Sequence, residues 1–485
     1  MAPDVPGCPR TSPRVPSPRA GRNEPTAPFI RVHLCPICGN TSSVAGKNKP
    51  TAVHAANAPA PARPITPIPM DDSIYRLRQR DILAVCVLAL VFLGVIMVQS
   101  AAMTVTGQPG WRWTARGTRH AVYAVAAILA FFAVGHVDYA RLNRPTRSPW
   151  RHPILWALAA AAVSCLIVLV PHVGLEVNGA RRWLPLGPIQ VQPSELGKWA
   201  IVLFLSWWLS RRPLNLDRFF LGFLPTLIPV AAICLLIVIQ DFGTAALIGL
   251  CAITMLIAGL VKWWHLALVI PPALAAAFWF VHHKAYRWTR VTAFMDPYAH
   301  AGKEGYHMIQ SLLSFSTGGI TGKGLGNGVQ KLGYLPEDTT DFIFAVICEE
   351  LGLFGAMLTV ALYLGILYVA WQAMKQKRDT FGRLLAFGIG SMIGCQAMIN
   401  IAVATVSVPT KGLSLPLVSA GGSGLIITCA ALGLLYSVCR HHHAPDPQST
   451  PEPLHTDDST QQISDNALVS PAAWQQWMAQ SQPAR

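Results

Sequence analysis

Long apolar runs decide what this chain can fold into. From Ile82 to Cys439, runs of about 18–25 mostly apolar residues follow one another, each long enough to cross a hydrocarbon layer of roughly 30 Å. Of the 485 residues, 52% are hydrophobic and only 13% are charged. This composition excludes a set of soluble domains, so the sequence predicts an all-α polytopic membrane protein.

We expect about ten transmembrane helices, with one long extracytoplasmic loop between helices 7 and 8. The spans are predicted at about residues 82–103, 119–136, 153–171, 194–210, 219–239, 243–261, 264–282, 342–373, 384–407 and 414–439. Lys and Arg concentrate in the loops on the side that the two termini share, and cytoplasmic loops carry such an excess. The predicted topology therefore has both termini in the cytoplasm and the long loop, 283–341, outside.

The two ends of the chain differ from this apolar body. Residues 1–69 are rich in Pro, Ala, Arg and Thr, which predicts a disordered extension, or a start of translation at Met70 instead. A Cys-x-x-Cys pair at 35–38 has the spacing of half a zinc site. The polar segment 444–485 is predicted to be a disordered cytoplasmic tail, which leaves 70–443 as the membrane domain.

The net charge of +15 does not indicate a nucleic-acid partner. Most basic residues lie in short loops between apolar runs, where they set topology and contact anionic lipid headgroups. Eight of the eleven cysteines lie inside apolar segments, where they behave as small hydrophobes. The sequence therefore predicts contact with membrane lipid, no nucleic acid and no disulfide framework.

Three acids stand directly before the eighth apolar run: Glu337, Asp338 and Asp341. Thr340 or Asp341 could cap the helix that follows. An acid at this place could also serve as a general base, if it reaches the attacking hydroxyl and has a suitable pKa. Glu349-Glu350 follow about two turns into the run, where we expect them to line the inner wall of a cavity.

A second polar cluster precedes the fourth predicted span. Arg182 belongs to its loop, and Ser194 is a candidate N-cap for the span. Glu195 and Lys198 stand three residues apart and therefore share one helix face just inside the membrane. They form either a structural ion pair or part of a functional site, because ionisable groups within a span are functional candidates.

Three further clusters lie on the same side of the predicted topology. Asp241 stands in a tight turn, where it either caps the next helix or takes part in the site. The long loop carries Arg290, Gln310-Ser311 and Lys331, around a glycine-rich stretch, 317–328, that lacks the P-loop ending. Its backbone amides could approach a phosphate, or it is only a flexible turn. Lys411 precedes a Gly/Ser-rich start to the last span.

Basic groups near the membrane plane together with a cluster of carboxylates suit an anionic, lipid-linked substrate. The cations would hold phosphates while a carboxylate removes a proton. Composition alone does not distinguish this enzyme from a transporter of the same substrate.

Several motifs across residues 75–440 resemble the FtsW/RodA/SpoVE family, and they occur in the order typical of that family. The matching pieces are Arg182–Pro188 (RWLPLGP), Gln192–Lys198 (QPSELGK), Asp241–Thr244 (DFGT), Gly324–Lys331 (GLGNGVQK), Leu335–Glu337 (LPE), Thr340–Ala345 (TDFIFA), Glu349–Gly352 (EELG) and Lys411–Pro416 (KGLSLP). The glycine-rich and Lys411 motifs are more similar to the division member of the family than to its elongation member.

The resemblance implies a peptidoglycan glycosyltransferase in the cytoplasmic (inner) membrane, at the division septum. It would polymerise lipid II into glycan strands, beside a class B penicillin-binding protein and other divisome proteins. By resemblance, Asp341 is the catalytic carboxylate. We expect the substrate to be bound by Arg182, Glu195, Lys198, Arg290, Gln310, Ser311, Lys331, Glu337 and Lys411. The resemblance leaves open whether a divalent cation, Mg or Mn, helps to hold the diphosphate. The alternatives are a flippase for lipid-linked precursors and a divisome scaffold.

This chain departs from the family pattern beside Asp341. The family usually has His where this chain has Thr339 and a small residue where it has Asp338. A further carboxylate nearby tends to raise the pKa of one member of such a group. We therefore expect Asp338 to alter the pH optimum.

Overall fold

The computed structural model describes residues 78–103, 113–144, 151–177, 180–187, 189–211, 216, 218–302, 304–377 and 379–441. All of them belong to the unit Asp72–Arg485. The predicted extension 1–69 with its Cys pair, and the predicted tail 444–485, lie outside the described residues.

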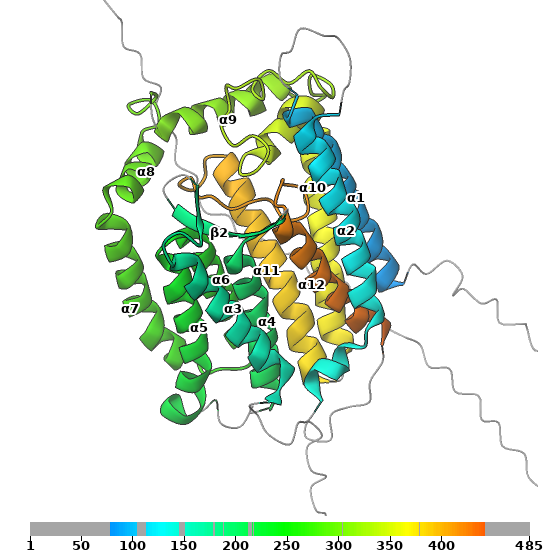
Figure 1. Cartoon of the computed structure of the whole chain (residues 1–485), viewed down its shortest axis with the longest axis vertical. Coiled ribbons are helices and arrows are strands. Elements are labelled where there is room, and N and C mark those ends of the chain that lie inside the picture. Colours follow the sequence, from blue (N-terminus) through cyan, green and yellow to red (C-terminus); the bar gives the residue numbers. More distant parts are fainter. Residues whose placement is uncertain are drawn as a thin grey trace, which may run out of the picture. The chain divides into compact units, whose positions relative to one another are not determined.

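Long helices make up most of this unit (Figure 1). In chain order they are α1 (Gln79–Ala101), α2 (Ala115–His136), α3 (Pro153–Leu169), α4 (Pro193–Arg211), α5 (Leu224–Val238, after the π-helix η5, Phe219–Phe223), α6 (Phe242–Ala258), α7 (Trp263–His282), α10 (Ile343–Gln376), α11 (Thr380–Ala404) and α12 (Ser423–Arg440). A short 3-10 helix, η2 (Tyr139–Asn143), follows α2.

Seven helices among the described residues are long and apolar enough to cross a membrane: α1, α2, η5 with α5, α7, α10, α11 and α12. The apolar helices α3 and α6 are shorter. The prediction of a helical, polytopic membrane protein is confirmed. Each predicted span overlaps one of the helices, but the count of ten crossings stays a prediction.

The helices pack side by side through apolar faces and small residues. α2 packs against α12, α10 packs against α1 and α11, and α11 also packs against α4 and α6. At the α2–α12 contact, a Cβ added to Gly433 would lie 2.5 Å from the carbonyl oxygen of Phe131. Small residues at such contacts let two backbones approach closely, which favours helix association in a membrane.

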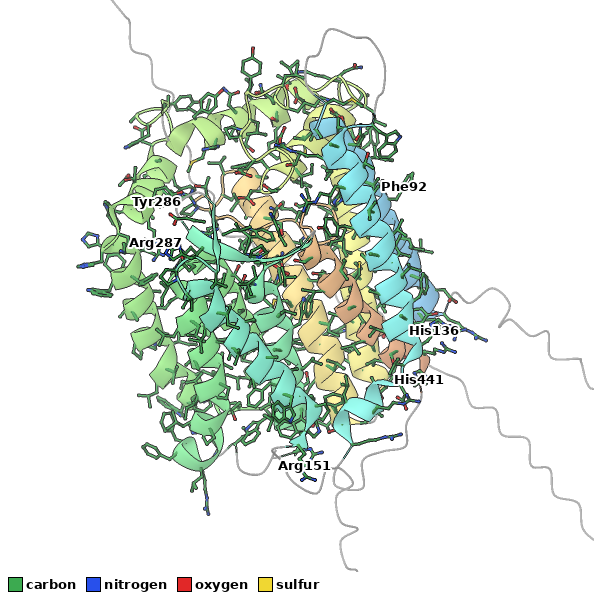
Figure 2. The ribbon with its side chains drawn as sticks, in the orientation of Figure 1. Phe92, His136, Arg151, Tyr286, Arg287 and His441 are labelled. Atoms are coloured by element: carbon green, nitrogen blue, oxygen red, sulfur yellow. The ribbon has the colours of Figure 1, made fainter. Side chains whose placement is uncertain are left out.

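The predicted long loop contains two further helices, α8 (Ala285–Met295) and α9 (Glu304–Gly318). Both lie at the end of the helix bundle where α10 begins, which we call the loop end (Figure 1). Figure 2 places Tyr286 and Arg287 of α8 toward this end and Arg151 at the opposite end. That the loop end faces the outside of the membrane stays a prediction.

A three-stranded antiparallel sheet, which the sequence analysis missed, stands between α3 and α4. Its strands are β1 (Leu175–Val177), β2 (Ala180–Leu186) and β3 (Ile189–Val191), in the order β1-β2-β3. Two strands have only three residues each, too short for a period-2 pattern to be recognised. The sheet matters for function because β2 carries Arg182.

α10 is broken at Gly352, whose backbone angles are φ 65° and ψ −158°. Residues with side chains rarely adopt this conformation. The segment after α9 fills the break: Lys323 and Gly324 donate their N–H groups to the carbonyls of Glu349 and Glu350, at 3.0 and 2.9 Å. The first turns of α10 and the glycine-rich stretch are therefore joined by backbone hydrogen bonds.

Candidate active site

The backbone before α10 is held in place by a second loop. Three consecutive carbonyls, those of Thr339, Thr340 and Asp341, accept hydrogen bonds from residues between α11 and α12 or from α11 itself. The donors are the N–H of Ala420 at 2.9 Å, the hydroxyl of Ser419 at 2.6 Å and the side-chain amide of Asn400 at 2.9 Å. The position of Asp341 thus depends on a segment distant in sequence.

The half-buried Asp341 carboxylate faces Gly412 and Arg182. A Cβ added to Gly412 would lie 3.5 Å from Oδ2 of Asp341 and 3.6 Å from Nη1 of Arg182. The predicted base and one predicted cation are therefore brought together around the Lys411–Leu413 segment.

The pKa of Asp341 is raised from 3.8 to about 7, mainly by burial and then by the nearby carboxylates of Glu337 and Asp241. Arg290 and Arg182 act in the opposite direction because a nearby cation stabilises the charged form. An acid with a pKa near neutrality can both take up and release a proton at physiological pH.

β2 and the turn between α5 and α6 together position Arg182. Its Nε donates to the carbonyl of Gln240 at 2.9 Å, and the side chain of Gln240 accepts from the N–H of Arg181 at 3.1 Å. Asp241 caps α6, as predicted, by accepting from the N–H and the hydroxyl of Thr244 at 3.1 and 2.6 Å. Beside them is a cavity of about 20 Å³, lined by Arg181, Arg182, Ser194, Gln240 and Asp241 among others, which is room for about one water.

Arg290 and Lys411 also lie near the acids. Arg290 is one of the cations that lower the pKa of Asp341, and its guanidinium stacks over the ring of Tyr286 at 4.5 Å. The Nζ of Lys411 lies 5.5 Å from the ring centroid of Phe242, and burial lowers the pKa of Lys411.

Arg287, which was not among the predicted site residues, ties α8 to this region. Its Nη2 lies 3.4 Å from the carbonyl of Val238 and 3.3 Å from that of Ile239, at the end of α5. Its guanidinium stacks 4.1 Å from the ring centroid of Phe280. Burial and then the nearby guanidinium of Arg182 lower the pKa of Arg287.

The two acids before Asp341 have different surroundings. Glu337 is exposed, has a φ of 55°, and accepts from the hydroxyl of Thr340 at 3.0 Å, so its side chain shapes the turn. Burial raises the pKa of Asp338 to about 6, Arg116 lowers it, and Glu337 adds a smaller increase. The predicted cap of α10 is wrong, because its N-cap is Phe342 and no side chain there makes a capping hydrogen bond.

Glu195 and Lys198 form the predicted pair on one face of α4. Oε1 of Glu195 lies 2.9 Å from Nζ of Lys198, and both side chains are buried. Lys198 also donates to Gln396 at 2.7 Å, and Gln396 donates to the carbonyl of Ser414 at 2.8 Å. This chain of contacts connects α4 and α11 to the Lys411 loop. Ser194 is the second residue of α4, so its predicted role as N-cap is wrong.

Lys331 belongs to another group of charges, which we call the Glu350 cluster: Ser100, Lys323, Lys331, Glu349 and Glu350. Lys331 donates to Oε1 of Glu350 at 2.6 Å and to Ser100 at 2.8 Å, and Lys323 pairs with Glu349 at 2.8 Å. Both acids are fully buried.

The glycine-rich stretch and the two residues that follow it, Val329 and Gln330, close over this cluster. The N–H groups of Gly326, Val329 and Gln330 donate to the two carboxylates at 3.1, 2.9 and 3.2 Å. Of the two predicted uses of this stretch, the structure supports the turn. These amides bind acids of the protein itself, so they are not available to a phosphate.

Gln310 and Ser311 lie in α9. The hydroxyl of Ser311 is buried and donates to the carbonyl of Ala404, at the end of α11, at 2.6 Å. The backbone carbonyl of Gln310 accepts from the hydroxyl of Ser314 at 3.0 Å. Ser311 is thus placed to hold α9 against α11 rather than to face Asp341.

Asn400 and Gln396 are the residues of this region that sequence reasoning missed. They stand four residues apart on α11, so they share one face, and both are buried. Two amides at this spacing in an apolar run are a signal that could have found them, because polar groups inside spans are rare and usually have a partner.

Among the residues that the structure describes, no group of three or more His, Cys, Asp and Glu side chains could hold a metal ion. Mg²⁺ is often held by one or two carboxylates together with substrate phosphates. Asp341 and Glu337 fit that mode, and the predicted Mg or Mn ion stays a prediction.

The fold and the site define a helical, multi-pass membrane protein in which Asp341, Arg182 and Arg290 lie together near the loop end of the helix bundle. Residues 80–444 match the family of FtsW, RodA and SpoVE, described as cell cycle proteins, and the chain belongs to this family. The sequence-based recognition of this family is therefore confirmed.

The names of similar proteins support this family membership. The chain is 39% identical over 362 residues to the probable peptidoglycan glycosyltransferase FtsW of Nitrosococcus halophilus, covering 72% of this chain and 89% of the relative. It is 34% identical over 361 residues to that of Coxiella burnetii, covering 73% and 95%.

Solved structures show the same fold. A chain from a peptidoglycan synthase complex that coordinates polymerization and crosslinking matches with a TM-score of 0.59 and 28% identity, over 74% of this chain and 96% of that one. The rod shape determining protein RodA of Thermus thermophilus matches with a TM-score of 0.53 and 27% identity, over 75% and 97%.

Proposed function

We propose that this protein is a peptidoglycan glycosyltransferase that polymerises lipid II into glycan strands during cell division. The observation that carries the proposal is Asp341, a half-buried carboxylate with a pKa near 7 that faces Arg182 across Gly412. The names of the FtsW relatives support the same activity.

In this proposal Asp341 is the general base. Its carboxylate takes the proton from a sugar hydroxyl of the acceptor as that oxygen bonds to the anomeric carbon of the donor. The bond from that carbon to the diphosphate oxygen breaks, and undecaprenyl diphosphate leaves with the electron pair. A general base contributes about 10²–10⁴-fold to such a step.

Arg182, Arg290 and Lys411 are proposed to hold the diphosphate. Two of these cations already act on the pKa of Asp341, and Arg182 and Lys411 flank Gly412 beside its carboxylate. Guanidinium groups bind phosphate oxygens in a bidentate manner and keep their charge. A bound divalent cation would supply further positive charge to the leaving diphosphate.

Five of the predicted substrate-binding residues have a structural role in this proposal: Glu195, Lys198, Lys331, Gln310 and Ser311. The side chains of Glu195, Lys198, Lys331 and Ser311 are bonded to other parts of the protein, so in this proposal they hold the walls of the site rather than the substrate. Gln310 is assigned to the same group because it precedes Ser311 on α9. Glu337 shapes the turn that presents Asp341.

We place the reaction on the outer face of the cytoplasmic membrane, at the septum, with both termini in the cytoplasm. This orientation follows from the bias of Lys and Arg in the loops. The partner would be a class B penicillin-binding protein within the divisome, which fits the likeness to a synthase complex that coordinates polymerization and crosslinking.

The test is reconstitution of the full chain in vesicles that contain purified lipid II, with and without a class B penicillin-binding protein. We expect glycan strands from the wild type and at least about 100-fold less from Asp341→Asn, which keeps the shape of the side chain but cannot accept the proton. Arg182→Gln and Lys411→Met should raise KM for lipid II, because each removes a proposed phosphate contact.

Ser391→Ala is a matched control, because its hydroxyl pairs with Thr254 at 2.7 Å, away from the acids. Unchanged polymer from Asp341→Asn would overturn the base assignment. Movement of lipid II across the bilayer without polymer would favour the flippase, and recruitment of the partner without either activity would favour the scaffold.

A further inference from the structure

We infer that Asn400 is a positioning residue that clamps Asp341 against the Lys411 loop. The inference rests on the proposed function, since it concerns the same reaction. Nδ2 of Asn400 donates two hydrogen bonds, to the carbonyl of Asp341 at 2.9 Å and to the carbonyl of Leu413 at 2.7 Å. One side chain therefore joins the segment of the base to the segment of a proposed phosphate-binding lysine.

The chemistry of the side chain suits this clamp. Both partners are carbonyl oxygens, which only accept, so only the NH₂ group of the amide can satisfy them. Asn400 is fully buried, and its Oδ1 accepts no hydrogen bond from the residues that the structure describes. A buried carbonyl that loses its donor is unfavourable because water does not replace it. The two carbonyls therefore depend on this one amide.

The clamp acts beside a close approach of the two segments. Gly412, between Lys411 and Leu413, faces Oδ2 of Asp341 and Nη1 of Arg182. Release of Leu413 would let this backbone move and change the gap between the carboxylate and the guanidinium. Ser419 and Ala420 hold the two preceding carbonyls, so the segment would stay attached while Asp341 lost its fixed place.

This arrangement predicts an effect on catalysis that differs from simple loss of stability. A displaced carboxylate is less well aligned with the acceptor hydroxyl, and small misplacements reduce the rate strongly. Asn400→Leu is the variant of choice, because leucine has a similar volume and no donor. We expect kcat for lipid II polymerisation to fall about 10- to 100-fold, with KM within about twofold of the wild type.

The pH profile is a second readout, which partial unfolding would not change. The charged groups that act on Asp341 are Glu337 in its own turn, Asp241 before α6, Arg182 on β2 and Arg290 on α8. In the α11–α12 loop, Gly412 faces its carboxylate, and the Nζ of the neighbouring Lys411 lies over the ring of Phe242. Burial is the main cause of the raised pKa of Asp341. A released carboxylate becomes better solvated, so the acidic limb of the kcat profile should move to lower pH in Asn400→Leu.

The experiment compares the wild type, Asn400→Leu, Asn400→Asp and Ser391→Ala in the same vesicles with purified lipid II. Asn400→Asp keeps the shape of the side chain, but its carboxylate cannot donate to two carbonyls, so we expect the same loss of kcat. Asn400→Asp is the test variant if Asn400→Leu fails to fold. Ser391→Ala also loses one hydrogen bond on α11 and should retain the wild-type kcat and pH profile.

The results separate this inference from the proposed function. If the wild type makes no polymer, the proposed function fails. If the wild type is active and Asp341→Asn is not, but the folded Asn400 variants keep the wild-type kcat and pH profile, only the clamp is overturned. A loss of kcat with an unshifted profile would also overturn it, because a smaller active fraction explains that result.

Discussion

Asp341 and Glu350 stand on either side of the start of α10, yet the groups around their two carboxylates are very different. Glu350 accepts hydrogen bonds from Ser100, Lys331 and the N–H of Gly326, and it is fully buried. Asp341 makes its hydrogen bond through its backbone carbonyl, and its half-buried carboxylate faces cations that lie beyond hydrogen-bond reach among the described residues.

This difference separates an acid that holds the fold from an acid that can react. The Glu350 carboxylate is occupied by the ammonium of Lys331, the hydroxyl of Ser100 and the N–H of Gly326, all within the protein. The half-buried Asp341 carboxylate, beside two other acids, has a raised pKa, and no hydrogen bond reaches it from the described part of the chain. The Glu350 cluster ties the glycine-rich stretch to α10, while Asp341 is the acid to which we assign the proton transfer.

The largest effect is expected from Asp341→Asn. Loss of the base should reduce the rate of lipid II polymerisation by about 10³-fold. We expect no loss of folded protein, because none of the residues that the structure describes donates a hydrogen bond to this carboxylate. Initial rates and size-exclusion profiles of the purified protein would measure both. A variant that is inactive because it unfolds would remove the contrast with Glu350.

Glu350→Ala should have the reverse effect, a loss of stability rather than the loss of a catalytic group. It leaves Lys331 buried without its charged partner, and breaking a buried pair in this way costs about 3–5 kcal/mol of stability. Thermal unfolding in detergent would measure the loss. In the double variant Glu350→Gln with Lys331→Met neither charge remains, so most of the stability should return; if it does not, the pair is not the main contribution of the cluster.

The pH dependence of Asp341 gives a smaller effect with a definite sign. Activity should rise with pH through about 7, as the base loses its proton. Because the pKa in the folded protein lies above its ordinary value, the stability due to protonated Asp341 is present at acid pH and lost as the pH rises through about 7.

Asp341→Asn should therefore unfold at a higher temperature than the wild type at pH 8 and at nearly the same temperature at pH 4. Unfolding curves at the two pH values would measure this. An equal difference in unfolding temperature at the two pH values would show that the pKa of Asp341 is not raised in the folded protein.

The smallest effect is expected from Asp338→Asn. The cations and acids that set the pKa of Asp341 are Glu337, Asp241, Arg290 and Arg182, and the pKa of Asp338 itself is raised mainly by burial. The pH–rate profile should keep its midpoint, and kcat should stay within about twofold of the wild type. A clear shift of this midpoint would show that Asp338 does affect the pKa of Asp341.

Much of this region could be read from the sequence because it depends on local patterns. The i,i+3 spacing of Glu195 and Lys198 predicted their pairing, and the turn at Asp241 predicted a cap. The break at Gly352 and the short strands were missed. The first lies inside the predicted span 342–373, where a single glycine does not by itself indicate a break. The second are too short to show a period.

The sequence by itself determined the helical membrane fold, the family and the position of the acids before α10, because these follow from residue order and hydrophobic period. Only the tertiary structure decided which charges meet. Lys331 joined Glu350 rather than Asp341, and Asn400 reached Asp341 and Leu413 from the last turns of α11. Such contacts join segments far apart in the chain, and helix packing rather than local spacing sets their distances.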